Sequence, residues 1–284
     1  MTDKNNITDP RQILQEEIMK SARGNSKVSK ICYELSLDPG PNRKIKNILI
    51  IKSPTIIWQK DQHSISTNIT EEVPEPLGPA YLAAVLRKNG YNPMIFDPHL
   101  EAYDEYILKQ DPDIVRNKLT ERLKNIDYDI VGISSMFTYA YKWAHFCCSE
   151  VKKINADIPV ILGGGYPTVV LKEVMNDKNI DYVVEGEGEA TLIHLLYELN
   201  KNPSKTTAIK NIGGLIYRNE RNEIIHNERT NFIWNLDEIP FPAWDLVDLN
   251  RYLSTYTGSG TAHEYRKKTA IMITERGCPF KCTF

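Results

Sequence analysis

The sequence of 284 residues has no apolar run approaching the roughly 20 residues that a membrane-spanning helix needs. It also has no excess of one charge, because 35 Lys and Arg face 37 Asp and Glu, for a formal net charge of -2. A nucleic acid or an anionic membrane would favour a concentrated basic surface, so we expect neither as a partner. The polar N-terminus, "MTDKNNITDPRQ", lacks the apolar segment of a secretion signal.

Cysteine is scarce, and the five that occur are scattered: Cys32, Cys147, Cys148, Cys278 and Cys282. An odd number without regular spacing does not fit the disulfide framework of a small secreted domain, and we expect a cytoplasmic protein. Two of the cysteines, Cys147 and Cys148, fall in the middle of a predicted helix. We interpret them as core or surface thiols.

Two common phosphate-binding motifs are absent: GxxxxGK[ST], and GxGxxG after the first strand. What the sequence has instead is an alternation of apolar strands with helices. Strands are expected at 46–52, 92–97, 128–135, 158–165 and the start of 180–200, and helices at 76–91, 138–155, 167–177 and the end of 180–200. This alternation predicts an α/β fold with an open, parallel, five-stranded Rossmann-like sheet and right-handed crossovers.

The predicted organisation has four parts. Residues 1–45 form a variable polar extension, and 46–203 form the Rossmann-like domain. Residues 204–268 contain a hairpin, "GGLIYR" with "EIIHN", and a proline-containing linker, "LDEIPFPAWDLVDLNRY". Residues 269–284 begin a further, incomplete domain with one new strand that leads into a cysteine pair.

In open parallel sheets, ligands bind outside the carboxyl ends of the strands. The residues predicted at that edge are Ser134, Ser135, Gly163, Gly164, Gly165, Pro167, Thr168, Glu185, Gly186 and Glu187. Glycines let the backbone approach a bulky ligand, although they also suit a plain strand-to-helix turn. The serines can bind a ligand or cap a helix, and the carboxylates can accept hydrogen bonds from a ligand or favour a helix N-terminus.

The end of the sequence, "TERGCPFKCTF", places Cys278 and Cys282 four residues apart. Such a pair by itself indicates little, since structural zinc sites usually use four ligands. In context, however, "RGCPFKCTF" resembles the beginning of the CxxxCxxC motif of radical S-adenosylmethionine (SAM) enzymes. Five further stretches resemble the cobalamin-binding domain of the B12-dependent subgroup: "PLGPAYLAAVLRKNGY", "VGISSMFT", "VILGGGYPT", "DYVVEGEGEATL" and "IPFPAWDL". The resemblance covers roughly residues 46 to 284.

The resemblance implies two cofactors besides SAM. One is a [4Fe–4S] cluster held by three thiolates, of which Cys278 and Cys282 would be two, with Phe280 packed nearby. The other is cobalamin, whose nucleotide tail would lie against Gly163–Gly165, with Pro167 and Thr168 beside it. Ser134 and Ser135 would line the same cleft, and Glu185, Gly186 and Glu187 would face the amide groups of the corrin ring. Cleavage of SAM at the reduced cluster would supply the radical, so the difficult chemistry belongs to the cofactors.

A lower axial histidine is not expected. "FDPHLEA" contains Asp97 and His99 at the spacing of a DxHxxG motif, but Ala102 replaces its glycine and the stretch follows the second strand rather than the first. His63, which follows the first strand, has no matching aspartate or glycine. We therefore expect cobalamin to bind without a histidine of the protein, and His99 to be an ordinary loop histidine.

The leading hypothesis is the cobalamin-binding N-terminal part of a B12-dependent radical SAM enzyme. Such an enzyme would use an external electron donor and would methylate or otherwise modify a small-molecule or natural-product substrate. Because the third cysteine of the motif would be the next residue, we expect a fragment without catalysis of its own. Two alternatives stay open: a stand-alone corrinoid-binding module, and an α/β fold that binds another nucleotide and holds zinc at the thiol pair.

Overall fold

The computed structural model describes residues 35–38, 40, 43–56, 58, 73–201, 208–230, 232–233, 235–255, 271–277 and 280. All of them belong to one compact unit, Tyr33–Phe284. Within these residues, no helix combines the length and the apolar character needed to cross a membrane.

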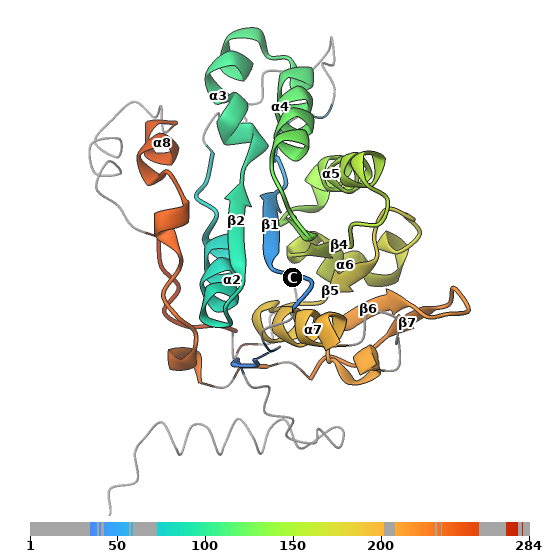
Figure 1. Cartoon of the computed structure of the whole chain (residues 1–284). Coiled ribbons are helices and arrows are strands. Elements are labelled where there is room, and N and C mark those ends of the chain that lie inside the picture. The colour runs from blue at the N-terminus through green and yellow to red at the C-terminus, as the bar shows by residue number, and fades with distance from the viewer. Residues whose placement is uncertain are drawn as a thin grey trace, which may run out of the picture. The chain divides into compact units, whose positions relative to one another are not determined.

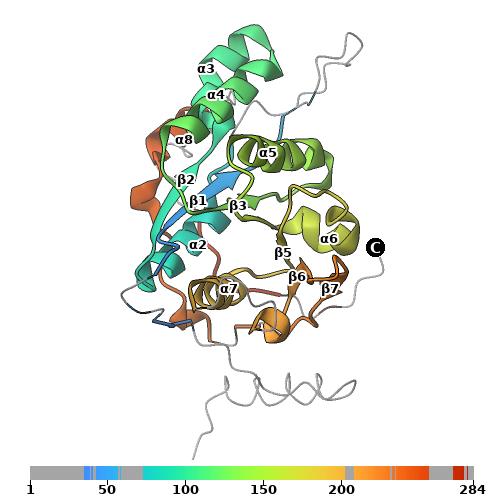
Figure 2. The same cartoon turned by 45° about the vertical axis from the view of Figure 1, so that its right-hand side comes forward.

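A single mixed sheet organises this unit. Its strands are β1 (Asn47–Lys52), β2 (Asn92–Phe96), β3 (Ile130–Ser134), β4 (Val160–Gly163), β5 (Tyr182–Val184), β6 (Leu215–Arg218) and β7 (Ile224–His226), in the order β2-β1-β3-β4-β5-β6-β7. The first five are parallel, which confirms the predicted α/β sheet. The predicted hairpin, β6 and β7, also forms, but it continues the same sheet antiparallel to β5 (Figure 2).

The helices are α2 (Leu77–Lys88), α3 (Pro98–Lys109), α4 (Pro112–Asn125), α5 (Tyr141–Ile154), α6 (Gly165–Val174), α7 (Glu189–Lys201) and α8 (Leu249–Ser254). Helices α3 and α4 lie between β2 and β3 and were not among the predicted elements. Each begins with an aspartate N-cap followed by proline, at Asp97 and Asp111, a combination that favours a helix start. Shorter 3₁₀ turns occur at Thr138–Ala140, Ala208–Asn211, Leu236–Glu238 and Trp244–Leu246.

Side-chain alternation along the strands builds a separate core on each face of the sheet. Ile48 and Ile50 of β1 pack with residues of α2 and α7, whereas Leu49 and Ile51 pack with residues of α4, α5 and α6. All four isoleucine and leucine side chains are buried. Strands buried on both faces read as continuous apolar runs, which is why "KNILIIK" is recognisable from sequence. Figure 1 shows α2 and α7 apart from α5 and α6 around this sheet.

The linker after the hairpin is packed against the domain. The backbone N–H of Ala243 donates to the carbonyl oxygen of Ala80 in α2 at 3.0 Å. Further along, Arg251 of α8 pairs with Asp104 of α3 at 3.2 Å. The segment predicted as an extended linker therefore runs along α2 and ends in a short helix beside α3 (Figure 1).

Part of the polar N-terminal segment also packs on the domain. The Asn89 side chain at the end of α2 accepts from the backbone of Leu37 at 2.8 Å and donates to the carbonyl of Leu35 at 2.9 Å. The Leu35 side chain is buried. Leu35 and Leu37, near the end of the predicted extension, therefore contact the sheet domain.

The strand expected at the start of 269–284 is not formed at residues 271–277, the part of it that is described. These residues pair with no strand of the described sheet, and Phe280 is 78% exposed. Four residues named from the sequence, Cys32, His63, Cys278 and Cys282, lie outside the described residues.

Candidate functional site

A cavity of about 350 Å³ lies between the sheet and helices α2 and α7, and it extends to the carboxyl ends of the central strands. Its residues are Ile48, Ile50, Gly132, Ile133, Ser134, Met136, Ile161, Gly163, Gly164, Gly165, Thr168, Val184, Gly186, Glu187, Gly188, Glu189 and Leu192, with Gly78 and Leu82 of α2 and Arg276. This is the edge at which ligands of open parallel sheets bind.

The depth of the cavity comes from missing side chains. A Cβ atom added at Gly132, in the middle of β3, would meet no other atom within 4 Å, and the same is true at Gly78 in the first turn of α2. Ile50 beside Gly132 on β1, and Ile161 beside it on β4, supply apolar walls. The result is a slot with an apolar floor and open space above a glycine.

The three glycines after β4 line the cavity, but two of them are also required by packing. Gly164 has a φ of +104°, and a Cβ there would lie 2.4 Å from the carbonyl oxygen of Ser135. A Cβ on Gly165 would lie 2.5 Å from the carbonyl oxygen of Met136. The turn interpretation is confirmed at Gly164 and Gly165, whereas ligand binding by these glycines stays a prediction.

Thr168 connects the glycine turn with the acidic turn after β5. Its hydroxyl donates to the carbonyl oxygen of Gly164 at 2.8 Å and accepts from the backbone N–H of Gly186 at 2.9 Å. One side chain in the first part of α6 thus fixes two of the turns that border the cavity.

The acidic turn holds a buried arginine that the sequence predictions did not include. The Arg276 guanidinium lies 2.6 Å from a carboxylate oxygen of Glu189 and 3.5 Å from one of Glu187. Burial by itself lowers the pKa of Arg276, but the two carboxylates outweigh it and raise that pKa. Glu187 and Glu189 therefore face a cation of the chain itself.

Three of the predicted site residues do not line the cavity. Ser135 is 1% exposed, and its hydroxyl has no hydrogen-bond partner in the described structure. Pro167 is buried in α6. Glu185 turns toward the hairpin, where its carboxylate lies 2.8 Å from Nε2 of His226 in β7.

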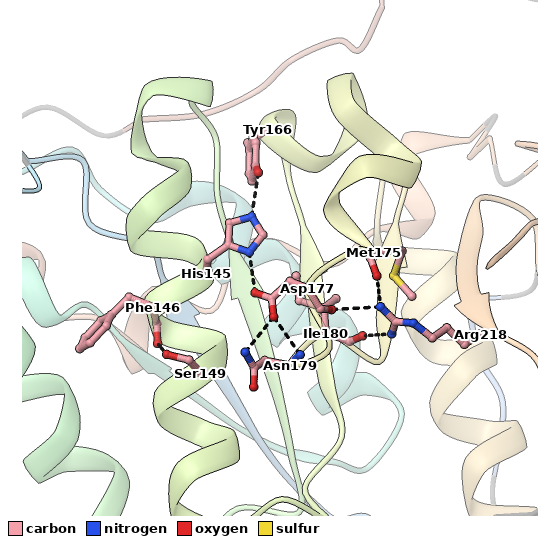
Figure 3. Close-up of polar contacts among 9 residues, drawn as sticks. All are labelled: His145, Phe146, Ser149, Tyr166, Met175, Asp177, Asn179, Ile180 and Arg218. Atoms are coloured by element: carbon pink, nitrogen blue, oxygen red, sulfur yellow. Dashed lines mark hydrogen bonds and ion pairs between the residues drawn. The ribbon is translucent and has the colours of Figure 1, made fainter. Parts of the chain in front are cut away.

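Hydrogen-bonded polar side chains connect α5 to Tyr166, the residue that follows the glycine turn (Figure 3). His145 of α5 places Nε2 at 2.9 Å from the hydroxyl of Tyr166, which directly follows the turn, and Nδ1 at 2.6 Å from Asp177. Asn179 donates to the same aspartate from its backbone and its side chain. Burial by itself raises the pKa of Asp177, but the hydrogen bonds from His145 and Asn179 outweigh it and hold the pKa below its ordinary value.

Arg218 of β6 closes the other end of α6 (Figure 3). It donates to the carbonyl oxygens of Ile180 at 2.7 Å and Asp177 at 3.0 Å, and to that of Met175. Carbonyls at a helix C-terminus lack partners within the helix, so a cation there stabilises it. The hairpin thus supports the helix that carries Tyr166 and Thr168.

The prediction that His99 is a loop histidine is wrong, because it lies in the first turn of α3 and is 2% exposed. Neither ring nitrogen has a partner in the described structure, and burial lowers the pKa of His99 to about 4. Its neighbour Asp97 accepts from Lys52 at 2.7 Å and from the hydroxyl of Tyr252 at 3.0 Å. His99 does not line the cavity.

The thiol predictions have different outcomes. Cys147 and Cys148 are buried core residues, and burial raises the pKa of both thiols. Across the described residues no cluster of three or more His, Cys, Asp or Glu side chains could hold a metal ion. The predicted cluster ligands, Cys278 and Cys282, lie beyond this description.

Among the lining residues missed from the sequence are Gly78, Leu82, Gly132, Leu192 and Arg276. Two of these carried a recognisable signal: glycine inside a strand or helix is disfavoured and often marks close approach of a ligand, which applies to Gly132 and Gly78. The other three look like ordinary helix and loop residues, and only the assembled cavity shows their part in it.

Comparison with known proteins identifies similar sequences and a similar fold. Residues 68–196 match the model of the B12 binding domain family. An uncharacterised methyltransferase of Pyrococcus horikoshii is 30% identical over 242 residues, covering 85% of this chain and 45% of that protein. Cytidylyl-2-hydroxyethylphosphonate methyltransferase of Streptomyces wedmorensis is 28% identical over 74% of this chain and 43% of its own length.

The fold has a solved counterpart. The cobalamin-dependent S-adenosylmethionine radical enzyme OxsB, solved with aqua-cobalamin and S-adenosylmethionine bound, matches with a TM-score of 0.52 and 18% identity. The match covers 75% of this chain and 26% of OxsB. The chain spans less than half the length of the two methyltransferases that it resembles. Residues 68–196 therefore resemble the B12 binding domain family, and the chain shares its fold with the matched part of OxsB.

Proposed function

We propose that the cavity between the sheet, α2 and α7 receives the nucleotide tail of cobalamin, and that the chain is the cobalamin-binding part of a B12-dependent radical SAM enzyme. The observation that carries the proposal is the glycine-floored slot itself. Its lining residues from Gly78 to Leu192 all belong to the segment that matches the B12 binding domain family, residues 68–196.

The residues present fit this ligand. The volume of about 350 Å³ is near the lower end of small-molecule sites, which run from about 300 to 1,000 Å³. An apolar slot above Gly132 suits the flat aromatic base of the tail. The hydroxyls of Ser134 and Thr168 at the cavity border supply polar groups for its sugar and phosphate.

The corrin ring is too large for this slot, so it would lie outside, over the carboxyl edge of the sheet. The loop after β3 exposes Met136, Phe137 and Tyr139 there, with 63%, 45% and 65% of their surface accessible. Phe137 and Tyr139 are stacked, with ring centroids 5.3 Å apart. A flat apolar surface next to the cavity supports binding of a macrocycle at this edge.

No described histidine lines the cavity. His99 is the nearest match by sequence, but it is enclosed by α3, where its ring contacts Tyr103 and Tyr106. For this chain we propose that cobalamin would be held without an imidazole from His99.

The radical part of the proposal rests on the resemblance and on the relatives. Bound cobalamin would supply a carrier for a methyl group, and a cluster with SAM would supply the radical. Cys278 and Cys282 would hold two irons of that cluster, and a third thiolate is needed besides them. The substrate class proposed is a small molecule or natural product, with an external protein as electron donor.

Cobalamin retention tests the proposal. The chain of residues 1–284 is incubated anaerobically with hydroxocobalamin and desalted, and its visible spectrum is recorded. We expect retained corrinoid, with the spectrum of cobalamin that lacks a lower nitrogen ligand. Loss of all corrinoid from the folded protein would contradict the proposal, and a nitrogen-ligated spectrum abolished by His99→Phe would contradict its statement on histidine.

A further inference from the structure

Arg276 connects the two helices that wall the cavity. Its guanidinium pairs with Glu189, the first residue of α7, and lies 5.6 Å from the ring centroid of Tyr81 in the first part of α2. It also pairs with Glu187 and borders the cavity. Arg276 therefore spans the cavity at the end where both helices begin, which is the carboxyl edge of the sheet.

A cation is unfavourable at this place without specific partners. Helix N-termini carry partial positive charge, and Arg276 lies near the start of two helices. Its side chain is only 17% exposed, and the Glu189 side chain only 6%. A charge with so little access to water is stable only if carboxylates pair with it and accept its hydrogen bonds. An exposed ion pair contributes much less, because water already solvates both charges.

This arginine is also what anchors its own segment. Of residues 271–277, Arg276 is the only one that is not exposed. The apolar side chains before it face outward, with Met272 at 71% exposure and Ile273 at 44%. The segment immediately before Cys278 is thus held to the domain through one buried side chain.

We propose that Arg276 is a positioning residue, a latch that fastens the segment before Cys278 across the cobalamin cavity and slows the escape of bound corrinoid. The inference rests on the proposed function for its ligand, but the latch itself exists without one. Coupling between sites is reciprocal. A ligand that the latch retains will in turn stabilise the latched position of the segment that leads into the cysteine pair.

The latch is tested first without ligand, by trypsin. Cleavage of the Arg276–Gly277 bond requires the Arg276 side chain to leave its carboxylates and enter the protease. We expect Glu189→Gln and Glu187→Gln to speed this cleavage, by about fivefold or more for Glu189→Gln, because a charged partner of the cation is lost. Glu105→Gln, which removes the exposed pair with Lys109 on α3, is the matched control and should leave the rate unchanged. Mass spectrometry of the released peptide identifies the bond, and equal rates in all four proteins would overturn the latch.

The second test measures the rate at which corrinoid leaves the 1–284 chain. At a temperature well below the melting temperature of every variant, Arg276→Gln should release hydroxocobalamin about tenfold faster, and Arg276→Lys should be intermediate because it keeps the charge without the planar guanidinium. The control is Arg87→Gln, which breaks the exposed ion pair between Arg87 of α2 and Asp245 of the linker. Release from Arg276→Gln at the wild-type rate would refute the latch. If the wild-type chain retains no corrinoid, the proposed function fails, and the trypsin rates alone decide the latch.

Discussion

At the scale of single residues, two glycines of the site lack a side chain for different reasons. Gly132 leaves open space that a Cβ would enter without touching another atom, whereas Gly164 is in close contact with the backbone of Ser135. We expect the space beside Gly132 to be available to a ligand, whereas the space beside Gly164 is occupied by the backbone of Ser135. This difference separates a binding effect from a folding effect in experiment.

Filling the slot should weaken corrinoid binding without destabilising the fold. In Gly132→Val a β-branched side chain suits the strand and occupies the cavity, so we expect stability to stay the same or rise slightly and corrinoid affinity to fall at least about tenfold. Equilibrium dialysis with hydroxocobalamin, together with thermal unfolding, measures both.

Gly164→Ala is the matched variant with the opposite expectation. A φ of +104° and a contact of 2.4 Å to a backbone oxygen leave no room for a methyl group. We expect the free energy of unfolding to fall by about 2 kcal/mol or more. Unchanged affinity in Gly132→Val, or unchanged stability in Gly164→Ala, would show that this assignment of the two glycines is wrong.

His99 predicts a pH dependence of stability. Its pKa is lowered from 6.5 to about 4 in the folded protein, so between these values the unfolded chain binds a proton that the folded chain does not. Stability from this group is therefore complete above pH 6.5 and is lost as the pH falls toward about 4. The loss amounts to about 3 kcal/mol, at 1.36 kcal/mol for each pKa unit.

Chemical denaturation at several pH values between 7 and 4 tests this expectation, with His99→Phe as the reference. The variant keeps a ring of similar size but cannot take up a proton, so its stability should decline less across the interval. The neighbouring charges of Lys52 and Asp97 remain in both proteins and cancel in the comparison. Parallel curves for the two proteins would contradict a buried neutral imidazole.

At the scale of elements, α6 is the part of the site that depends most on its neighbours. Its start carries the glycine turn and Thr168, and its residue Tyr166 is held by His145 of α5 (Figure 3). Its end is held by Arg218 of β6. The two antiparallel strands that extend the sheet therefore act on the cavity through this helix.

Arg218→Met should show that dependence. Methionine keeps the apolar stem but removes the donors to the carbonyls at the end of α6, so the free energy of unfolding should drop by about 2 kcal/mol. Amide exchange across 165–174 should accelerate more than exchange in α5. A drop in stability with no preferential change in α6 would mean that Arg218 supports the fold generally and not this helix.

At the scale of the whole molecule, the sheet domain is joined by segments that flank it in the chain. Leu35 and Leu37, the linker along α2, and Arg276 all contact the α2 side of the sheet, on which the cavity lies. Ligand binding in this cavity is therefore expected to stabilise the unit as a whole, because its walls come from distant parts of the sequence.

A ligand that binds only the folded state raises stability by mass action. At a free hydroxocobalamin concentration 100 times the dissociation constant, the free energy of unfolding should rise by about 2.7 kcal/mol. The melting temperature should increase with ligand concentration in the wild-type chain and increase less at each concentration in Gly132→Val. A constant melting temperature in both proteins would show that the folded chain does not bind this corrinoid.

The amino-acid sequence alone determined the five parallel strands, the hairpin and most residues of the turns at the carboxyl edge. Strands buried on both faces and turns rich in glycine leave local patterns that can be read without a structure. It did not identify the buried position of His99, or α3 and α4, although each of these helices begins with an Asp-Pro pair that favours a helix start.

Only the tertiary structure decided which residues share the cavity. Gly132, Leu192 and Arg276 lie far apart along the chain, and their meeting depends on strand order and on the packing of α2 and α7, which no local pattern specifies. It also showed that Glu187 and Glu189 face an arginine, because a carboxylate's partner is chosen by proximity in space. The sequence determines the local elements and turns, whereas the contacts between side chains that are distant in sequence depend on the tertiary structure.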